Sequence, residues 1–329
     1  WTRRRPSRSS SASMAARRRW RLLALGLAAA AGTALIAVAV VWASYLVVDP
    51  RLRWTAPADL PTVHGLRAAA AHLLPFPHEY RDGMLLQFSK EEIVRPGFLH
   101  GRIYYGGLWY YLPAALLVKT PLGLLALGAA GAVGLCLIRR LRPAVPYVLL
   151  PTAVLLATAM TGHRDLGVRY AIFMPFFLAV AAAAVTAVRR WWAHAATAAL
   201  VAFAGVSSVS TYPYYLPYAN EAFGGPAKTH LWLHDSNVDW GQDLGRLADR
   251  LRERYPHDKV WLVYKGSGEP SYYGIHAADP LTAARDEVRG LLVVSDSAAA
   301  TAEAPLAALI GRGRAVDQVG HSITIYRLP

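Results

Sequence analysis

The sequence predicts a polytopic α-helical membrane protein, with about five transmembrane helices followed by a C-terminal α/β domain outside the cytoplasm. Apolar runs long enough to cross a bilayer occur only before Tyr212, and basic clusters mark the ends of several of them. The sequence after Tyr212 reads as an ordinary globular domain. We therefore divide the chain into a basic, disordered cytoplasmic N-terminus (1–21), a transmembrane domain (22–211) and an extracytoplasmic domain (212–329).

The expected spans follow from the length that a bilayer requires, which is about 20 mostly apolar residues in a helix. Two of the apolar runs are shorter than this but can be extended by flanking residues. The five spans are Leu22–Val48, Leu122–Ile138, Val145–Met160, Val168–Val188 and Ala193–Ser210.

Three basic clusters predict the same orientation for these spans. Arg17–Arg21 precedes the first span, Arg139–Arg142 follows the second, and Arg189–Arg190 follows the fourth. Positive residues favour the cytoplasmic side. The expected result is a plasma-membrane protein whose outer side carries a long loop, 49–111, and the whole C-terminal domain.

The net charge of +14 also comes from basic residues in the part of the chain that contains the expected spans. The segment from Tyr212 onward contains 12 basic and 14 acidic residues, which leaves 23 of the chain's 35 basic and 7 of its 21 acidic residues in the earlier part. The positive charge is thus concentrated beside apolar runs. It does not form the basic surface of a nucleic-acid-binding protein, so no nucleic-acid partner is expected. The single cysteine, Cys136, excludes an intramolecular disulfide.

The C-terminal domain mixes helical and strand patterns. Helical spacing of Leu244, Leu247 and Leu251 predicts a helix within 241–255. A second helix is expected around Pro305–Ile310, ended by Gly311. The expected strands are Val260–Tyr264, Leu291–Ser295 and Ile323–Leu328.

The densest polar motif is DSNVDWGQDL, at 235–244. Its acidic start resembles a calcium loop, but Trp240 and Arg246 stand where an EF-hand needs Gly and Glu, so we expect no metal site. Two interpretations remain open: Asp239 caps the following helix, or the motif forms a polar rim that faces a membrane-embedded site. The rim residues are Asp235, Asn237, Asp239, Trp240 and Gln242.

Four cationic or titratable residues lie at the outer mouths of apolar segments. Arg164, Arg169 and His163 belong to MTGHRDLGVRY, and Lys119 precedes Pro121 at the start of the second span. Charges at such depth are costly unless they are paired or functional. A guanidinium there suits a lipid phosphate. The alternatives are a solvated Arg164–Asp165 pair and a lysine that snorkels to the interface.

Aromatic residues follow in GRIYYGGLWYY, at 101–111. Tyr104, Tyr105 and Trp109 suit an interfacial aromatic belt at the headgroup level of a membrane.

The ordered set LPFPHEYRDGM, GRIYYGGLWYYLPAALLVKTPLGLL, GHRDLGVRYAIFMPFF, YPYYLPYANEAFGGP, DSNVDWGQDL and PSYYGI resembles the C-terminal half of bacterial family 39-like glycosyltransferases. These membrane enzymes belong to the C-type superfamily and are related to protein O-mannosyltransferases and aminoarabinose transferases. The resemblance covers roughly Trp42 to Ile275.

The resemblance implies transfer of a sugar from a polyprenyl-phosphate carrier to an extracytoplasmic acceptor of unknown identity. It makes Lys119, Arg164, Arg169 and His163 candidate ligands of the lipid phosphate. It also implies that Tyr104, Tyr105 and Trp109 line the lipid or sugar groove. No cofactor is evident, and the need for a divalent cation stays open. The family's acidic catalytic motif lies in an N-terminal half that this sequence lacks, so the catalytic base is unknown. That missing half is an expected partner, and a non-catalytic binding or scaffold remnant is the alternative function.

Overall fold

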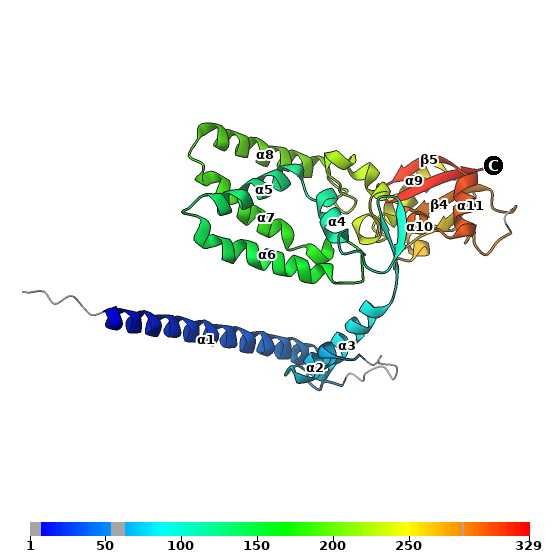
Figure 1. Ribbon diagram of the computed structural model, residues 1–329. Coiled ribbons are helices and arrows are strands. Elements are labelled where there is room, and N and C mark those ends of the chain that lie inside the picture. Colours follow the sequence, from blue (N-terminus) through cyan, green and yellow to red (C-terminus); the bar gives the residue numbers. More distant parts are fainter. Residues whose placement is uncertain (1–7, 54–62, 285) are drawn as a thin grey trace, which may run out of the picture. The chain divides into compact units, whose positions relative to one another are not determined.

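The computed structural model describes residues 8–53, 63–284 and 286–329. These residues form two compact units, one within 1–93 and the other within 94–329 (Figure 1). The predicted disorder of residues 1–7 lies outside the described part. Residues 8–21 were also expected to be disordered, but they are helical and form the first part of α1, which runs from Arg8 to Val48. Their Arg, Ala and Met residues favour the helix that continues into the apolar segment.

The first unit consists of one long helix and two shorter ones: α1 (Arg8–Val48), α2 (Leu66–Leu73) and α3 (His78–Glu92). Two contacts made by aromatic side chains join the end of α1 to α3 and to the residues just before it. Trp42 Nε1 donates a hydrogen bond to Pro75 O at 2.8 Å, and the Tyr45 and Tyr80 rings meet edge-on at 6.1 Å. The expected outer loop 49–111 therefore contains regular structure.

The second unit begins with an antiparallel hairpin, β1 (Pro96–Leu99) and β2 (Arg102–Tyr105), and continues into α4 (Tyr111–Lys119). The apolar helices α5 (Leu122–Leu137), α6 (Val145–Met160), α7 (Met174–Ala182) and α8 (Trp191–Ser210) follow. Helix α5 packs against both α7 and α8.

Small residues on α5 allow this close packing. A Cβ atom added at Gly131 would collide with the backbone of Ala181 on α7, and one added at Gly123 would collide with Leu200 O on α8. Backbones can approach this closely only where a side chain is absent, which is typical of packed membrane helices.

Three helical segments are long and apolar enough to cross a membrane within the described chain: Trp20–Val48, Arg142–Met160 and Trp191–Ser210. Two more, Leu122–Leu137 and Met174–Ala187, are apolar but shorter. The expected fourth span, 168–188, is divided into a 3₁₀ turn η2 (Val168–Ala171), α7 and a 3₁₀ turn η3 (Ala183–Ala187). Pro175 explains the first break, because proline has no N–H to donate and favours the first turn of a new helix.

The C-terminal part contains a four-stranded sheet in the order β3-β4-β6-β5. Strands β3 (Val260–Val263) and β4 (Gly290–Ser295) are parallel, whereas β6 (Ile323–Leu328) is antiparallel to both β4 and β5 (Arg314–Val319). The three predicted strands are confirmed, and β5 is an additional strand. Its exposed, polar sequence RAVDQV lacks the apolar pattern that would have predicted it.

Helices cover both faces of this sheet, because β4 is apolar on both sides. Leu291 and Val293 pack with α9 (Leu244–Arg254), whereas Leu292 and Val294 pack with α11 (Ala304–Arg312). A short helix, α10 (Asp296–Ala300), follows β4 directly. Helix α11 continues through Gly311, the residue expected to end it, and its C-cap is Gly313.

Candidate functional site

The DSNVDWGQDL segment begins with a 3₁₀ turn, η6 (Asp235–Asn237), that is anchored to the α/β domain. Asp235 N donates to Ser297 Oγ at 2.8 Å, and Lys265 Nζ lies 2.5 Å from Asp235 Oδ2. Asp235 has a positive φ of 54°, a conformation that Asp tolerates better than most residues. The turn thus holds a buried carboxylate against a lysine from the loop after β3.

Asn237 connects the same turn to the membrane-proximal helices. It is fully buried, and its amide nitrogen donates to Tyr111 OH at 2.9 Å and to His234 O at 3.1 Å. Its amide oxygen accepts from Val168 N at 3.1 Å. Asn237 was expected at a polar rim, and the structure places it as a buried link between α4, η2 and η6.

Lys119, at the end of α4 and before the apolar helix α5, contacts the same region. Its Nζ donates to Leu216 O and to Asn237 O, each at 2.6 Å. Burial lowers the pKa of Lys119 to about 7. An ammonium carries three donors, so two carbonyl acceptors leave one N–H for a further ligand.

A cavity of about 280 Å³ opens beside η6, and we call it the polar pocket. Its lining residues come from the loop before η2, from η2 itself, from the DSNVDWGQDL segment and from the loop after β3. They are Leu166, Arg169, Asp235, Asp239, Trp240, Lys265, Gly266 and Ser267. Two cations and two carboxylates therefore surround one small space.

Arg169 is held at this pocket by two aromatic rings. Its guanidinium carbon lies 4.9 Å from the centre of the Trp240 ring and 5.2 Å from that of Tyr170. Such cation–π contacts orient a planar guanidinium without neutralising its charge. The side chain remains exposed and able to bind an anion.

A second cavity, also of about 280 Å³, lies among the ends of the apolar helices, and we call it the apolar groove. Its lining is dominated by apolar side chains but includes two cations. The residues are Leu116, Lys119, Thr120, Val168, Arg169, Ala171, Ile172, Pro175, Tyr215, Leu216 and Ser236. Arg169 lines both cavities, so a charged group beside it would have an apolar space on one side and a polar space on the other.

Burial and neighbouring charges shift the pKa values of the two carboxyl groups in the polar pocket. Burial raises the pKa of Asp239 to about 6, against the opposing hydrogen bond from Gly241 N, 2.9 Å from Oδ1. Burial also disfavours the charged form of Asp235, but the hydrogen bond and charge of Lys265 outweigh it and lower the pKa of that carboxyl. One carboxylate is thus firmly ionised, and the other titrates close to neutral pH.

Asp239 does not cap α9, contrary to one of the two interpretations of the motif. Helix α9 begins at Leu244, and Asp239 instead accepts the Gly241 N–H within the preceding turn. Gln242 supports this turn, because its Oε1 accepts from Trp240 N at 2.7 Å and its Nε2 donates to Val238 O at 3.1 Å. The turn presents Trp240, which is exposed, at the pocket.

The remaining predicted site residues lie away from the linings of these two cavities. Tyr104 OH donates to Asp165 Oδ2 at 2.8 Å, and Leu108 N donates to the same oxygen at 2.7 Å, which joins the hairpin to the loop that carries His163 and Arg164. His163 is exposed and Arg164 half-buried. Tyr105 and Trp109 are both exposed.

Lys265 is the main residue of the polar pocket that sequence reasoning missed. It follows the predicted strand Val260–Tyr264 directly, within KGSG. A charged residue at the carboxyl end of a parallel strand, followed by a glycine loop, is the signal that would have indicated it, because sites gather at such edges.

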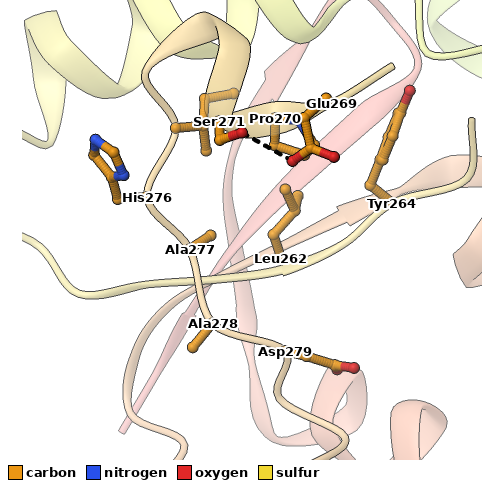
Figure 2. Close-up of a pocket in the computed structure, with 10 residues that line it drawn as sticks. Leu262, Tyr264, Glu269, Pro270, Ser271, His276, Ala277, Ala278 and Asp279 are labelled. Carbon is orange, nitrogen blue, oxygen red and sulfur yellow. Dashed lines mark hydrogen bonds between the residues drawn. The ribbon is translucent and has the colours of Figure 1, made fainter. Parts of the chain in front are cut away.

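A larger, more open cavity of about 530 Å³ lies in the α/β domain beside β3 (Figure 2). It is lined by Leu262, Tyr264 and the segments 269–271 and 275–279. Ser271 Oγ donates to Glu269 Oε1 at 3.0 Å. Ala278 forms two backbone hydrogen bonds with β3: its N donates to Val260 O, and its O accepts from Leu262 N. Glu269 already has a partner and Asp279 caps its own turn through Leu281 N, so this cavity has less unsatisfied polar chemistry than the polar pocket.

Across the part of the chain that the structure describes, no three His, Cys, Asp or Glu side chains gather as a metal ion would require. Comparisons with protein-family models, curated proteins and solved structures find no significant match to this chain. The geometry and chemistry of the site are therefore the evidence for function.

Proposed function

We propose that this chain is the C-terminal, donor-binding portion of a membrane glycosyltransferase that takes a sugar from a polyprenyl-phosphate carrier and transfers it to an acceptor outside the cytoplasm. The observation that carries the proposal is the position of Arg169. Its guanidinium lines both the apolar groove and the polar pocket. A prenyl phosphate sugar has the same order of groups, with an apolar chain, an anionic phosphate and a polar sugar.

In this arrangement the phosphate lies between Arg169 and Lys119. Arg169 offers a planar fork of donors that Trp240 and Tyr170 orient. Lys119 contributes the N–H that its two carbonyl acceptors leave unused. A bound phosphate anion would favour the protonated form of Lys119 over the neutral amine that burial favours, and both cations would then stabilise the phosphate as it departs from the sugar.

The two cavities accommodate the other parts of the donor. The first isoprene units lie along Leu116, Ile172 and Pro175 of the apolar groove. The sugar occupies the polar pocket, where Asp235 and Asp239 can accept hydrogen bonds from its hydroxyl groups. Asp239, with a pKa of about 6, is suited to accept a proton at neutral pH.

The proposal includes the five-span topology and a plasma-membrane location. The two shorter apolar helices, Leu122–Leu137 and Met174–Ala187, complete the count of five with the three longer ones. The basic clusters at 17–21, 139–142 and 189–190 support an orientation in which the polar pocket and the α/β domain lie on the outer side. A reporter that is active only outside the cytoplasm should give a signal when it is fused after Pro329. A signal from a reporter that is active only in the cytoplasm, fused at the same place, would overturn the orientation.

A binding measurement on the full chain in lipid nanodiscs tests donor recognition. Undecaprenyl phosphate should bind, whereas undecaprenol, which lacks the phosphate, should bind at least tenfold more weakly. Arg169→Ala should weaken the binding of the phosphate by about tenfold or more, since a hydrogen bond to a charged group contributes about 1.5–3 kcal/mol.

Arg252→Ala is the matched control. Arg252 is an exposed arginine of α9 paired with Asp249, and its loss removes the same charge away from both cavities. If both arginine variants bound undecaprenyl phosphate as tightly as the unaltered chain, Arg169 would not be a phosphate ligand. Binding without release of sugar from a polyprenyl-phosphate sugar would favour the alternative function, a non-catalytic binding or scaffold protein.

A further inference from the structure

The first unit contains a buried carboxylate that the proposed function does not use. Glu79 is the second residue of α3, and its side chain is 6% exposed. Neither of its carboxylate oxygens has a hydrogen-bond partner in the structure as described. His78 Nε2 lies 3.3 Å from Oε1, but the His78 side chain is about half exposed and the contact is not a hydrogen bond.

Such a carboxylate requires an explanation. A buried charge is strongly unfavourable unless it is paired and hydrogen-bonded. The N-terminal end of α3 supplies a favourable dipole for Glu79, but this effect is small compared with the cost of burying an ionised group. A buried polar group without a hydrogen-bond partner is unusual, and a bound water, ion or ligand is one of its explanations.

Glu79 lines a cavity of about 590 Å³ at the end of α1, which we call the α1–α3 cavity. The other lining residues are Tyr45, Val48, Asp49, Leu52 and Arg53. The Trp42–Pro75 hydrogen bond and the Phe76–Tyr80 ring contact, with centroids 4.7 Å apart, hold the start of α3 in place. The carboxylate therefore belongs to a preformed cavity.

The charges around this cavity are arranged for a zwitterion. Asp49 already accepts two backbone hydrogen bonds, from Arg51 N at 3.0 Å and Arg53 N at 2.8 Å. Among the lining residues that the structure describes, this leaves the Glu79 carboxylate and the Arg53 guanidinium as the charged groups available to a ligand. One attracts an ammonium and the other a phosphate, while Val48 and Leu52 supply an apolar wall.

The cavity also lies where phospholipid headgroups are found. It adjoins Val48, the last residue of an apolar helical segment that is long enough to cross a bilayer. Groups at the end of such a span lie at the level of the headgroups. An ammonium and a phosphate joined by a short linker form the headgroup of phosphatidylethanolamine, and the acyl chains of this lipid lie in the bilayer.

We infer that the α1–α3 cavity is a binding site for the ethanolamine phosphate headgroup of a membrane lipid, with its ammonium on Glu79 and its phosphate toward Arg53. The site does not depend on the proposed transferase activity. A quaternary choline headgroup lacks the N–H donors that Glu79 needs, and a glycerol headgroup lacks the positive charge, so both should bind less well.

Native mass spectrometry of the full chain, purified in detergent and supplied with defined lipids, tests this inference. Dioleoyl phosphatidylethanolamine should be retained at least tenfold better than the matching phosphatidylglycerol or phosphatidylcholine. Glu79→Gln should abolish the preference, whereas Glu253→Gln, which removes a charge from an exposed residue of α9, should leave it intact.

Two further arms make the result decisive. Arg53→Ala should reduce retention of phosphatidylethanolamine about tenfold, which keeps the test available if Glu79→Gln does not fold. Glu79→Gln should bind undecaprenyl phosphate as the unaltered chain does, so failure at this cavity is distinguishable from failure of the donor site. Preference retained in both cavity variants would overturn the inference. If soluble phosphoethanolamine bound as tightly as dioleoyl phosphatidylethanolamine, the assignment to a lipid would be overturned.

Discussion

The guanidinium carbon of Arg169 lies 4.9 Å from the centre of the Trp240 ring, and this contact joins η2 to the DSNVDWGQDL segment. The two residues are far apart in the sequence, yet both line the polar pocket. Trp240 is exposed, so its role is better explained by holding Arg169 than by filling a core. The contact orients a cation at the boundary between an apolar and a polar space.

Replacing Trp240 by leucine should therefore affect ligand binding more than stability. An exposed cation–π contact contributes about 0.5–1 kcal/mol, so Trp240→Leu should weaken undecaprenyl phosphate binding about two- to fivefold. The melting temperature should change little. Trp240→Phe, which keeps a ring, should lie between the two in the same titration. Equal binding by all three proteins would show that the ring does not position Arg169.

Asn237 should be among the residues most sensitive to substitution. Asn237→Ala leaves a buried Val168 N–H without its acceptor and Tyr111 OH and His234 O without their donor, which predicts a loss of about 3–5 kcal/mol. Tyr111→Phe removes one of these bonds and should cost about 1 kcal/mol. Denaturant titration of both variants in detergent measures the difference. A loss no larger than that of Tyr111→Phe would contradict the role of Asn237 as a link.

Asp239 predicts a pH dependence of stability. Its pKa of about 6 in the folded protein is higher than the value of about 3.9 in an unfolded chain. The folded state therefore binds the extra proton, and the associated stability is present below about pH 4 and lost as the pH rises through about 6. Asp239→Asn keeps an oxygen for Gly241 N–H but cannot ionise.

The variant should melt at a higher temperature than the unaltered chain at pH 7.5, and the difference should shrink toward zero at pH 4. Melting curves across this range measure the effect. Asp249→Asn, at an exposed position of α9, is the control and should show no comparable trend. A pH-independent difference for Asp239→Asn would exclude titration of this carboxyl as its cause.

The packing of α5 predicts a contrast between two glycines. Gly131→Val places a side chain against the backbone of Ala181, so α5 and α7 must separate, and the melting temperature should fall by several degrees. Gly205→Val on α8 meets nothing within 4 Å and makes the same chemical change. The two variants can be compared by thermal melting in one detergent. Equal effects would indicate that helix propensity, and not close packing, determines the result.

Local patterns in the sequence were sufficient to predict much of the fold. Apolar runs predicted α5, α6 and α8 to within two residues, and apolar residues at strand spacing predicted β3, β4 and β6. Strand β5 was missed because its ladder depends on β6, not on its own composition. The break before α7 was also missed, although Pro175 was visible within the apolar run.

The site was less predictable because its contacts are not local. The importance of Arg169, Asp235, Asp239 and Trp240 was expected, and all four line the polar pocket. Their convergence with Lys265 could not be predicted, since it depends on how β3 directs the following loop. Glu79 gave no signal at all, because burial without a partner is visible only in three dimensions.

The two carbonyl acceptors of Lys119 are synthesised long after Lys119 itself. Asn237 O follows Lys119 by 118 residues and Leu216 O by 97. At a usual rate of about 5–20 residues per second, the ribosome needs roughly 6–24 seconds after Lys119 to reach Asn237. During that interval the nascent chain carries an amine at the end of α4 without either carbonyl. Lys119 should therefore stay accessible to amine-reactive reagents in arrested chains that end before residue 216, and become protected once residue 237 has emerged and folded.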